Sequence, residues 1–182
     1  MNRQLCCILL VLATAIRCSA AQREQKWESD ISEVLKQFSG YHLLTMSERN
    51  NDARAFLLHE SSKTNPSIVR ADFDGDGHAD YAVLLKHDGD EKAKFVVLLC
   101  SENANCRSVY ELDVTGVIAE MYLRPLPKGS ELSETAAIDT HDDTTSAKLH
   151  TVGIQVNYLE KAAVVYYWSK NTGKIETIVT ED

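Results

Sequence analysis

The chain has 182 residues and a formal net charge of -8, with 27 acidic and 19 basic side chains. This length suits one domain, and 44% hydrophobic residues is an ordinary proportion for a globular protein. A net negative surface disfavours nucleic acids and anionic lipids as partners, because both carry phosphate charges of the same sign. It favours a basic protein as the partner.

Residues 1–21 have the three-part layout of a secretory signal peptide. A basic start precedes an apolar run over 5–16, and small residues follow up to Ala21. The apolar run is too short to span a bilayer as a helix. We therefore expect cleavage of this segment, a periplasmic or secreted location, and one mature domain over 22–182. An uncleaved N-terminal anchor is the alternative.

Helical patterns come first in the mature chain. A capping box of the form D-x-x-E starts at Asp30, and apolar residues at helical spacing follow it, which predicts a helix over 29–39. Residues 41–46 favour a short strand. A second helical pattern covers 51–62 and ends in a segment with a proline, which cannot continue a helix.

The stretch DFDGDGHAD over 72–80 concentrates acidic side chains and glycines. Its aspartates fall at positions 1, 3, 5 and 9, which is the ligand order of an EF-hand loop for Ca²⁺. Carboxylates this close repel one another unless a cation neutralises them. An acidic turn without metal is the alternative. The predicted calcium ligands are Asp72, Asp74, Asp76, the backbone carbonyl of His78, and Asp80.

The residues after the loop depart from an EF-hand. Position 12 is Val83 inside an apolar run, where an EF-hand has a bidentate Glu, so we expect a strand to follow. The pattern D-x-D-G-D-G-x-x-D-Y-A-V-L-L over 72–85 resembles the calcium loops of FG-GAP and VCBS-type repeats, and of small exported bacterial proteins with one such loop. This resemblance implies a calcium ion that pins a β-hairpin. The motif occurs once, which argues against a full propeller.

Strand patterns dominate the rest of the chain. Apolar runs over 81–86 and 95–100 flank a polar turn and predict a hairpin. Further strands are expected over 108–112, 117–123, 152–158, 162–168 and 174–180, with loops at 125–134 and 139–146. The predicted fold class is α+β. An N-terminal helix or helices precede an antiparallel, mostly β-meander sheet region, which is partly propeller-like or sandwich-like.

The cysteines agree with export. Only Cys100 and Cys106 remain once the signal segment is removed. An even pair in an exported protein predicts a disulfide, here closing a small loop between two strands. Two free thiols are the alternative.

We expect a non-catalytic protein, because the chain has no G-x-S-x-G elbow, P-loop, H-E-x-x-H pair or dinucleotide fingerprint. The sharpest hypothesis is an inhibitor or immunity protein against a secreted, basic peptidoglycan hydrolase. The alternatives are a structural calcium module and an accessory subunit of a cell-envelope enzyme that uses the acidic loop 139–146. The residues expected to bind the partner are Ser101, Glu102, Asn103, Asn105, Lys128 and Ser130.

Overall fold

The computed structural model describes residues 31–60, 65–102, 105–133, 146–159, 161 and 163–180. The chain divides into two compact units, Met1–Ser39 and Gly40–Asp182. The expected signal segment 1–21 and most of the acidic loop 139–146 lie outside the described residues. In the first unit, residues 31–35 are helical and residues 36–39 form turns and a bend, so the helix predicted over 29–39 ends earlier than expected.

The first sheet of the second unit is centred on β3. Its strands are β1 (Tyr41–Leu43), β2 (Ile68–Ala71), β3 (Asp80–His87), β4 (Ala93–Cys100) and β5 (Cys106–Asp113). They follow the order β1-β3-β4-β5, and β2 also pairs with β3, all antiparallel. Most of β3 and β4 is buried on both faces, which explains their continuous apolar sequences. The predicted hairpin over these two strands is confirmed.

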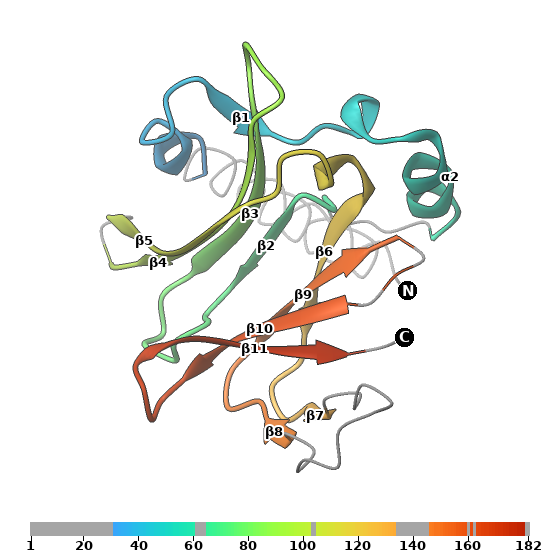
Figure 1. Cartoon of the computed structure of the whole chain (residues 1–182). Coiled ribbons are helices and arrows are strands. Elements are labelled where there is room, and N and C mark those ends of the chain that lie inside the picture. The colour runs from blue at the N-terminus through green and yellow to red at the C-terminus, as the bar shows by residue number, and fades with distance from the viewer. Residues whose placement is uncertain are drawn as a thin grey trace, which may run out of the picture. The chain divides into compact units, whose positions relative to one another are not determined.

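The second sheet has the order β11-β10-β9-β6. Its strands are β6 (Met121–Leu126), β9 (Gly153–Tyr158), β10 (Ala163–Ser169) and β11 (Lys174–Thr180). Figure 1 shows β9, β10 and β11 side by side. A separate two-stranded sheet pairs β7 (Glu131–Ser133) with β8 (Ser146–Lys148). These strands are too short to produce an alternating pattern, so the sequence did not predict them.

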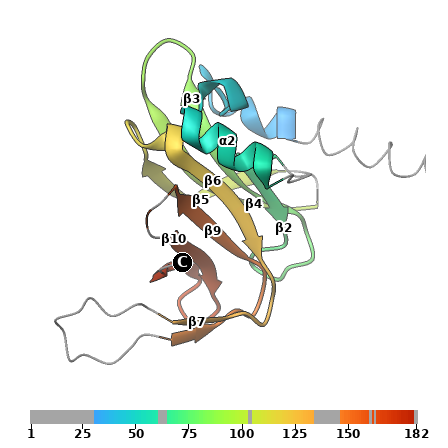
Figure 2. The same cartoon turned by 90° about the vertical axis from the view of Figure 1, so that its right-hand side faces the viewer.

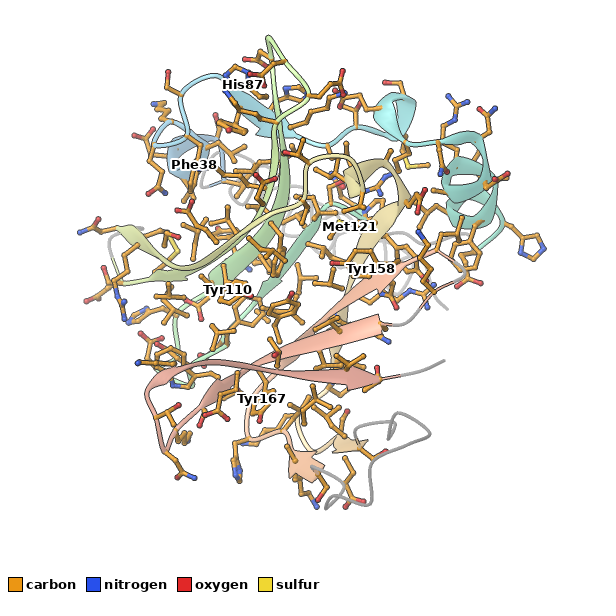
Figure 3. All side chains as sticks on the ribbon, viewed as in Figure 1. Phe38, His87, Tyr110, Met121, Tyr158 and Tyr167 are labelled. Atoms are coloured by element: carbon orange, nitrogen blue, oxygen red, sulfur yellow. A yellow bond between two sulfur atoms is a disulfide. The ribbon has the colours of Figure 1, made fainter. Side chains whose placement is uncertain are left out.

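The two larger sheets share one hydrophobic core. Phe95 and Val97 of the first sheet belong to the same buried cluster as Val156 and Tyr166 of the second. Tyr110 projects from β5 toward β10 (Figure 3), and its ring centroid lies 5.1 Å from that of Tyr166. Because successive strand residues point to opposite faces, Val165 belongs instead to a smaller cluster on the other face of the second sheet.

The predicted fold class α+β is wrong, because the structure is mostly antiparallel β with open sheets and short helices. Helix α2 (Asn51–His59) is capped by Asn50, whose side chain accepts a hydrogen bond from the Ala53 N–H at 2.8 Å. It lies beside β6 (Figure 2), with Phe56 and Tyr122 in ring contact. Only Ala53 and Leu57 of α2 are buried, so strands supply most of the core.

Two element boundaries also differ from the predictions. The first half of the strand expected over 117–123 is a 3-10 turn, η2 (Ile118–Glu120), and β6 starts only at Met121. The loop expected over 125–134 contains the end of β6 and all of β7. Among the described residues, no helix has both the length and the apolar character needed to cross a membrane.

A buried arginine joins three segments of the second unit. Arg49 follows the 3-10 turn η1 (Met46–Glu48) and is only 3% exposed. It donates hydrogen bonds to the Met121 carbonyl and, at 2.6 Å, to the Ser67 hydroxyl. Burial lowers the pKa of Arg49 to about 10, so the group remains charged at neutral pH. The two oxygens that accept from it are neutral, and they lie on β6 and on the segment that leads into β2.

Replacing Arg49 tests this connection. Arg49→Gln is expected to lower the free energy of unfolding by about 1–3 kcal/mol, because the Met121 carbonyl is left buried without its donor. Urea denaturation measures the loss. Arg54→Gln on α2, where the Arg54 guanidinium bonds the exposed Asn51 side chain, is the control and should stay within about 0.5 kcal/mol of the wild type. Equal losses in the two variants would contradict the role given to Arg49.

Candidate metal centre

The acidic loop is the connection of a β-hairpin. Strands β2 and β3 pair antiparallel, and Ala71 lies opposite Asp80, so residues 72–79 form the turn between them. Gly75 and Gly77 have φ angles of 85° and 91°, a left-handed conformation that glycine adopts without steric cost. The strand expected directly after the loop is confirmed, since β3 starts at Asp80.

Backbone N–H groups of the loop orient its carboxylates. The two oxygens of Asp72 accept hydrogen bonds from Gly75 N–H at 2.7 Å and Gly77 N–H at 3.0 Å. Asp74 accepts from the N–H of Asp76 at 3.1 Å. Asp76 in turn accepts from the N–H of residue 78 at 2.7 Å. The side chains are thereby held by the turn that carries them.

Three of the predicted ligands come together. One carboxylate oxygen each from Asp72, Asp74 and Asp80 lies within 4.8 Å of the others, so this group can hold a metal ion. Asp72 and Asp74 are half-buried, and Asp80 is buried. Asp76 is exposed and stands outside the group, and His78, expected to contribute its backbone carbonyl, is half-buried on the same loop.

Asp80 joins the loop to the neighbouring strand. It has no exposed surface, and its two oxygens accept hydrogen bonds from Phe73 N–H at 2.7 Å and Cys100 N–H at 2.9 Å. Burial, together with the charges of Asp74 and Asp76, raises the pKa of Asp80 to about 6, although the two backbone hydrogen bonds act in the opposite direction. A cation beside these carboxylates would favour the ionised form.

The predicted disulfide is confirmed and lies next to this centre. Cys100 and Cys106 are bonded and stand opposite each other where β4 and β5 meet. Ser101 N–H donates to the Asn105 carbonyl at 3.1 Å inside the closed turn. Because Cys100 also donates to Asp80, the disulfide turn and the acidic loop meet at one buried carboxylate.

The acidic loop and the disulfide turn line a common hollow of about 330 Å³. Asp74 and Asp76 contribute from the loop, and Ser101 and Asn105 from the turn. Arg107 on β5 also lines the hollow. Sequence reasoning missed Arg107, because its place beside the loop depends on the β4–β5 register and on no local motif.

The residues expected to bind a partner separate into two places. Ser101 and Asn105 line the hollow, and Glu102 is exposed on the same turn. Asn103 lies outside the described residues. Lys128 and Ser130 flank Gly129 in the turn between β6 and β7, where Gly129 N–H donates to the Leu149 carbonyl at 2.8 Å. The structure does not bring these two residues into the hollow.

Two residues far along the chain also contact the acidic loop. The Thr151 hydroxyl donates to the Phe73 carbonyl at 2.6 Å. Lys170, in the turn between β10 and β11, places its ammonium 3.9 Å from the position that a Cβ on Gly75 would take. Both residues come from the second sheet and its connections, so their approach depends on how the sheets pack.

Comparison of the chain with models of known protein families, with curated proteins and with solved structures found no match. The resemblance to FG-GAP and VCBS-type calcium loops therefore stays a prediction that rests on the residues of the loop. The convergence of the three carboxylates does not depend on that resemblance.

Asp80 and Asp74 are expected to behave differently when substituted. In the presence of a chelator, Asp80→Asn should lower the free energy of unfolding by about 1–3 kcal/mol, because an amide nitrogen then faces one of two buried backbone N–H donors. Asp74→Asn should lower it much less, because the hydrogen bond that the Asp74 carboxylate accepts from the Asp76 N–H is exposed to solvent. Urea denaturation of both variants measures this, and an equal loss would show that Asp80 has no special structural role.

Proposed function

We propose that this chain is an exported, non-catalytic calcium-binding protein whose ion braces a surface for another protein. The observation that carries the proposal is the convergence of Asp72, Asp74 and Asp80 beside a disulfide-closed turn. The burial of Asp80 supports a bracing role, because a cation there would act on a carboxylate that already connects two strands.

The donor set favours calcium among the metals that proteins bind. All three converging groups are carboxylates, and oxygen donors suit hard cations such as Ca²⁺ and Mg²⁺, whereas structural Zn²⁺ sites are built with Cys and His. Calcium accepts six to eight oxygens in a flexible arrangement, and the loop has further oxygens on Asp76 and on the carbonyl of His78. The ligand order of the loop, which matches calcium loops, points the same way.

With a divalent cation bound, the hollow keeps a small negative charge that is compatible with a basic partner. Three carboxylates exceed a divalent cation by one negative charge, Asp76 adds a second at the same hollow, and Arg107 in the lining offsets one of the two. The net charge of the whole chain has the same sign and would steer a cationic protein toward it. The sharpest form of the proposal is an inhibitor or immunity protein that blocks a basic peptidoglycan hydrolase with this face.

Calcium is expected to raise the melting temperature of the purified mature protein. Asp74→Asn should remove the gain, because the converging group then loses a charged ligand. Glu91→Gln removes the same charge from an 89% exposed side chain in the β3–β4 turn and should leave the gain intact. Thermal unfolding with calcium and with a chelator measures the effect. Identical wild-type curves under the two conditions would rule out the calcium site.

Binding of the partner is tested separately from binding of calcium. Titration calorimetry with a basic lysozyme and with other purified peptidoglycan hydrolases is expected to give micromolar or tighter binding and inhibition in calcium. Glu102→Lys reverses the charge of an exposed side chain on the disulfide turn that is not among the residues lining the hollow with Asp74, so it should weaken the complex tenfold or more while the calcium-dependent gain in melting temperature remains. No binding to any basic hydrolase would remove the inhibitor hypothesis and leave a structural calcium module.

A further inference from the structure

His42 lies between two carboxylates that come from different segments. Its Nδ1 is 2.6 Å from Asp88 Oδ1, in the turn between β3 and β4. Its Nε2 is 2.9 Å from one oxygen of Glu48 in η1 and 3.1 Å from the other. An ionised carboxylate only accepts hydrogen bonds, so each ring nitrogen needs its own proton for both contacts to form. The geometry is therefore that of an imidazolium.

The other charged groups around His42 already have partners. Lys86 lies directly across from His42 in β3, and its ammonium is 3.6 Å from Glu91. His87, the next residue of β3, has its Nδ1 3.0 Å from Asp90, which Lys92 also contacts at 3.0 Å. The two carboxylates that face the His42 ring are therefore those of Glu48 and Asp88.

The two carboxylates are held with very different strength. Glu48 also accepts hydrogen bonds from the N–H of Thr45 at 2.9 Å and from its hydroxyl at 2.8 Å. Asp88 has a side chain that is 64% exposed, and His42 is its one side-chain hydrogen-bond partner within the described part of the chain. A neutral ring keeps a single N–H, so it can donate to only one of them. Glu48 is the better-placed acceptor, and the contact with Asp88 is the one that is lost.

We propose that His42 is a proton-operated clamp on the β3–β4 turn. With both nitrogens protonated, it ties Asp88 in the turn to β1 and to Glu48. When the ring loses a proton, the bond to Glu48 remains and the turn beyond Asp88 is released. The pairing of β1 with β3 persists in both states, because Asp88 N–H also donates to the Gly40 carbonyl at 2.8 Å.

The direction of the pH dependence follows from the ring's surroundings. Burial by itself lowers the pKa of His42, but the hydrogen bonds and charges of Glu48 and Asp88 outweigh it and raise the pKa above 6.5. A group whose pKa is higher in the folded state stabilises the fold fully below the unfolded value. The clamp is therefore closed in mildly acidic solution, below the unfolded pKa, and its contribution is lost as the pH rises through the folded pKa.

This device is separate from the proposed calcium site. The acidic loop precedes β3 and the clamped turn follows it, at opposite ends of the strand (Figure 1). Eight residues of extended strand span about 25 Å, well beyond a Debye length at physiological salt. Calcium or chelator should leave the His42 titration unchanged, so the clamp and the calcium site can fail independently.

NMR titration of the histidine ring nitrogens tests the clamp. Wild-type His42 is expected to titrate above 6.5, with both nitrogens protonated at about pH 5.5. Asp88→Asn should lower its pKa by about half a unit, the size expected for a partly exposed ion pair. A His42 pKa at or below 6.5, or no response to Asp88→Asn, would overturn the proposal.

Hydrogen exchange tests the release of the turn. Relative to His42→Gln, the wild type should protect the amides of 88–92 more strongly at about pH 5.5, and the difference should vanish near about pH 8.5. His150→Gln is the matched control, because His150 is exposed on a different segment of the same unit. If the amides of 88–92 are protected equally in the wild type and in His42→Gln at every pH, the ring does not hold the turn. If His42→Gln fails to fold, the protection of the same amides is compared between the wild type and Asp88→Asn, with the same expected and contradicting outcomes.

Discussion

The rest of the candidate centre depends on one buried carboxylate. Asp80 starts β3 and has no contact with solvent, yet both of its oxygens have backbone donors, one in the acidic loop and one at the end of β4. A buried charge is tolerated only with such partners. The same side chain therefore closes the loop, places a third carboxylate beside those of Asp72 and Asp74, and connects the loop to Cys100 of the disulfide.

Charged groups in this protein have three different kinds of partner. Arg49 is buried with neutral oxygens as acceptors, so it acts as a fixed connection between segments. The aspartates of the loop repel one another, which makes a cation their natural counterion. His42 balances Glu48 and Asp88 with a proton that solution pH can remove. A fixed connection, a loop proposed to bind a cation and a turn proposed to respond to pH are thus distributed along the first sheet and its connections.

Long apolar runs made most strands predictable, whereas the fold class was mispredicted. The runs that became β3 and β4 carry enough buried side chains to be recognised from the sequence alone. The helical patterns over 29–39 and 51–62 were given too much weight, since α2 buries only Ala53 and Leu57. Strands β7 and β8 have three residues each, and their pairing is a long-range contact that no local pattern reveals.

The sequence by itself determined the acidic loop and the strand that follows it, and it predicted the disulfide that the structure confirms. The loop and strand depend on spacing within a few residues, and turn geometry follows from such spacing. Only the tertiary structure decided that Asp76 stands outside the converging group, that Arg107 lines the same hollow, and that His42 lies between Glu48 and Asp88. Those arrangements follow from strand register and sheet packing, which bring together residues far apart in the chain.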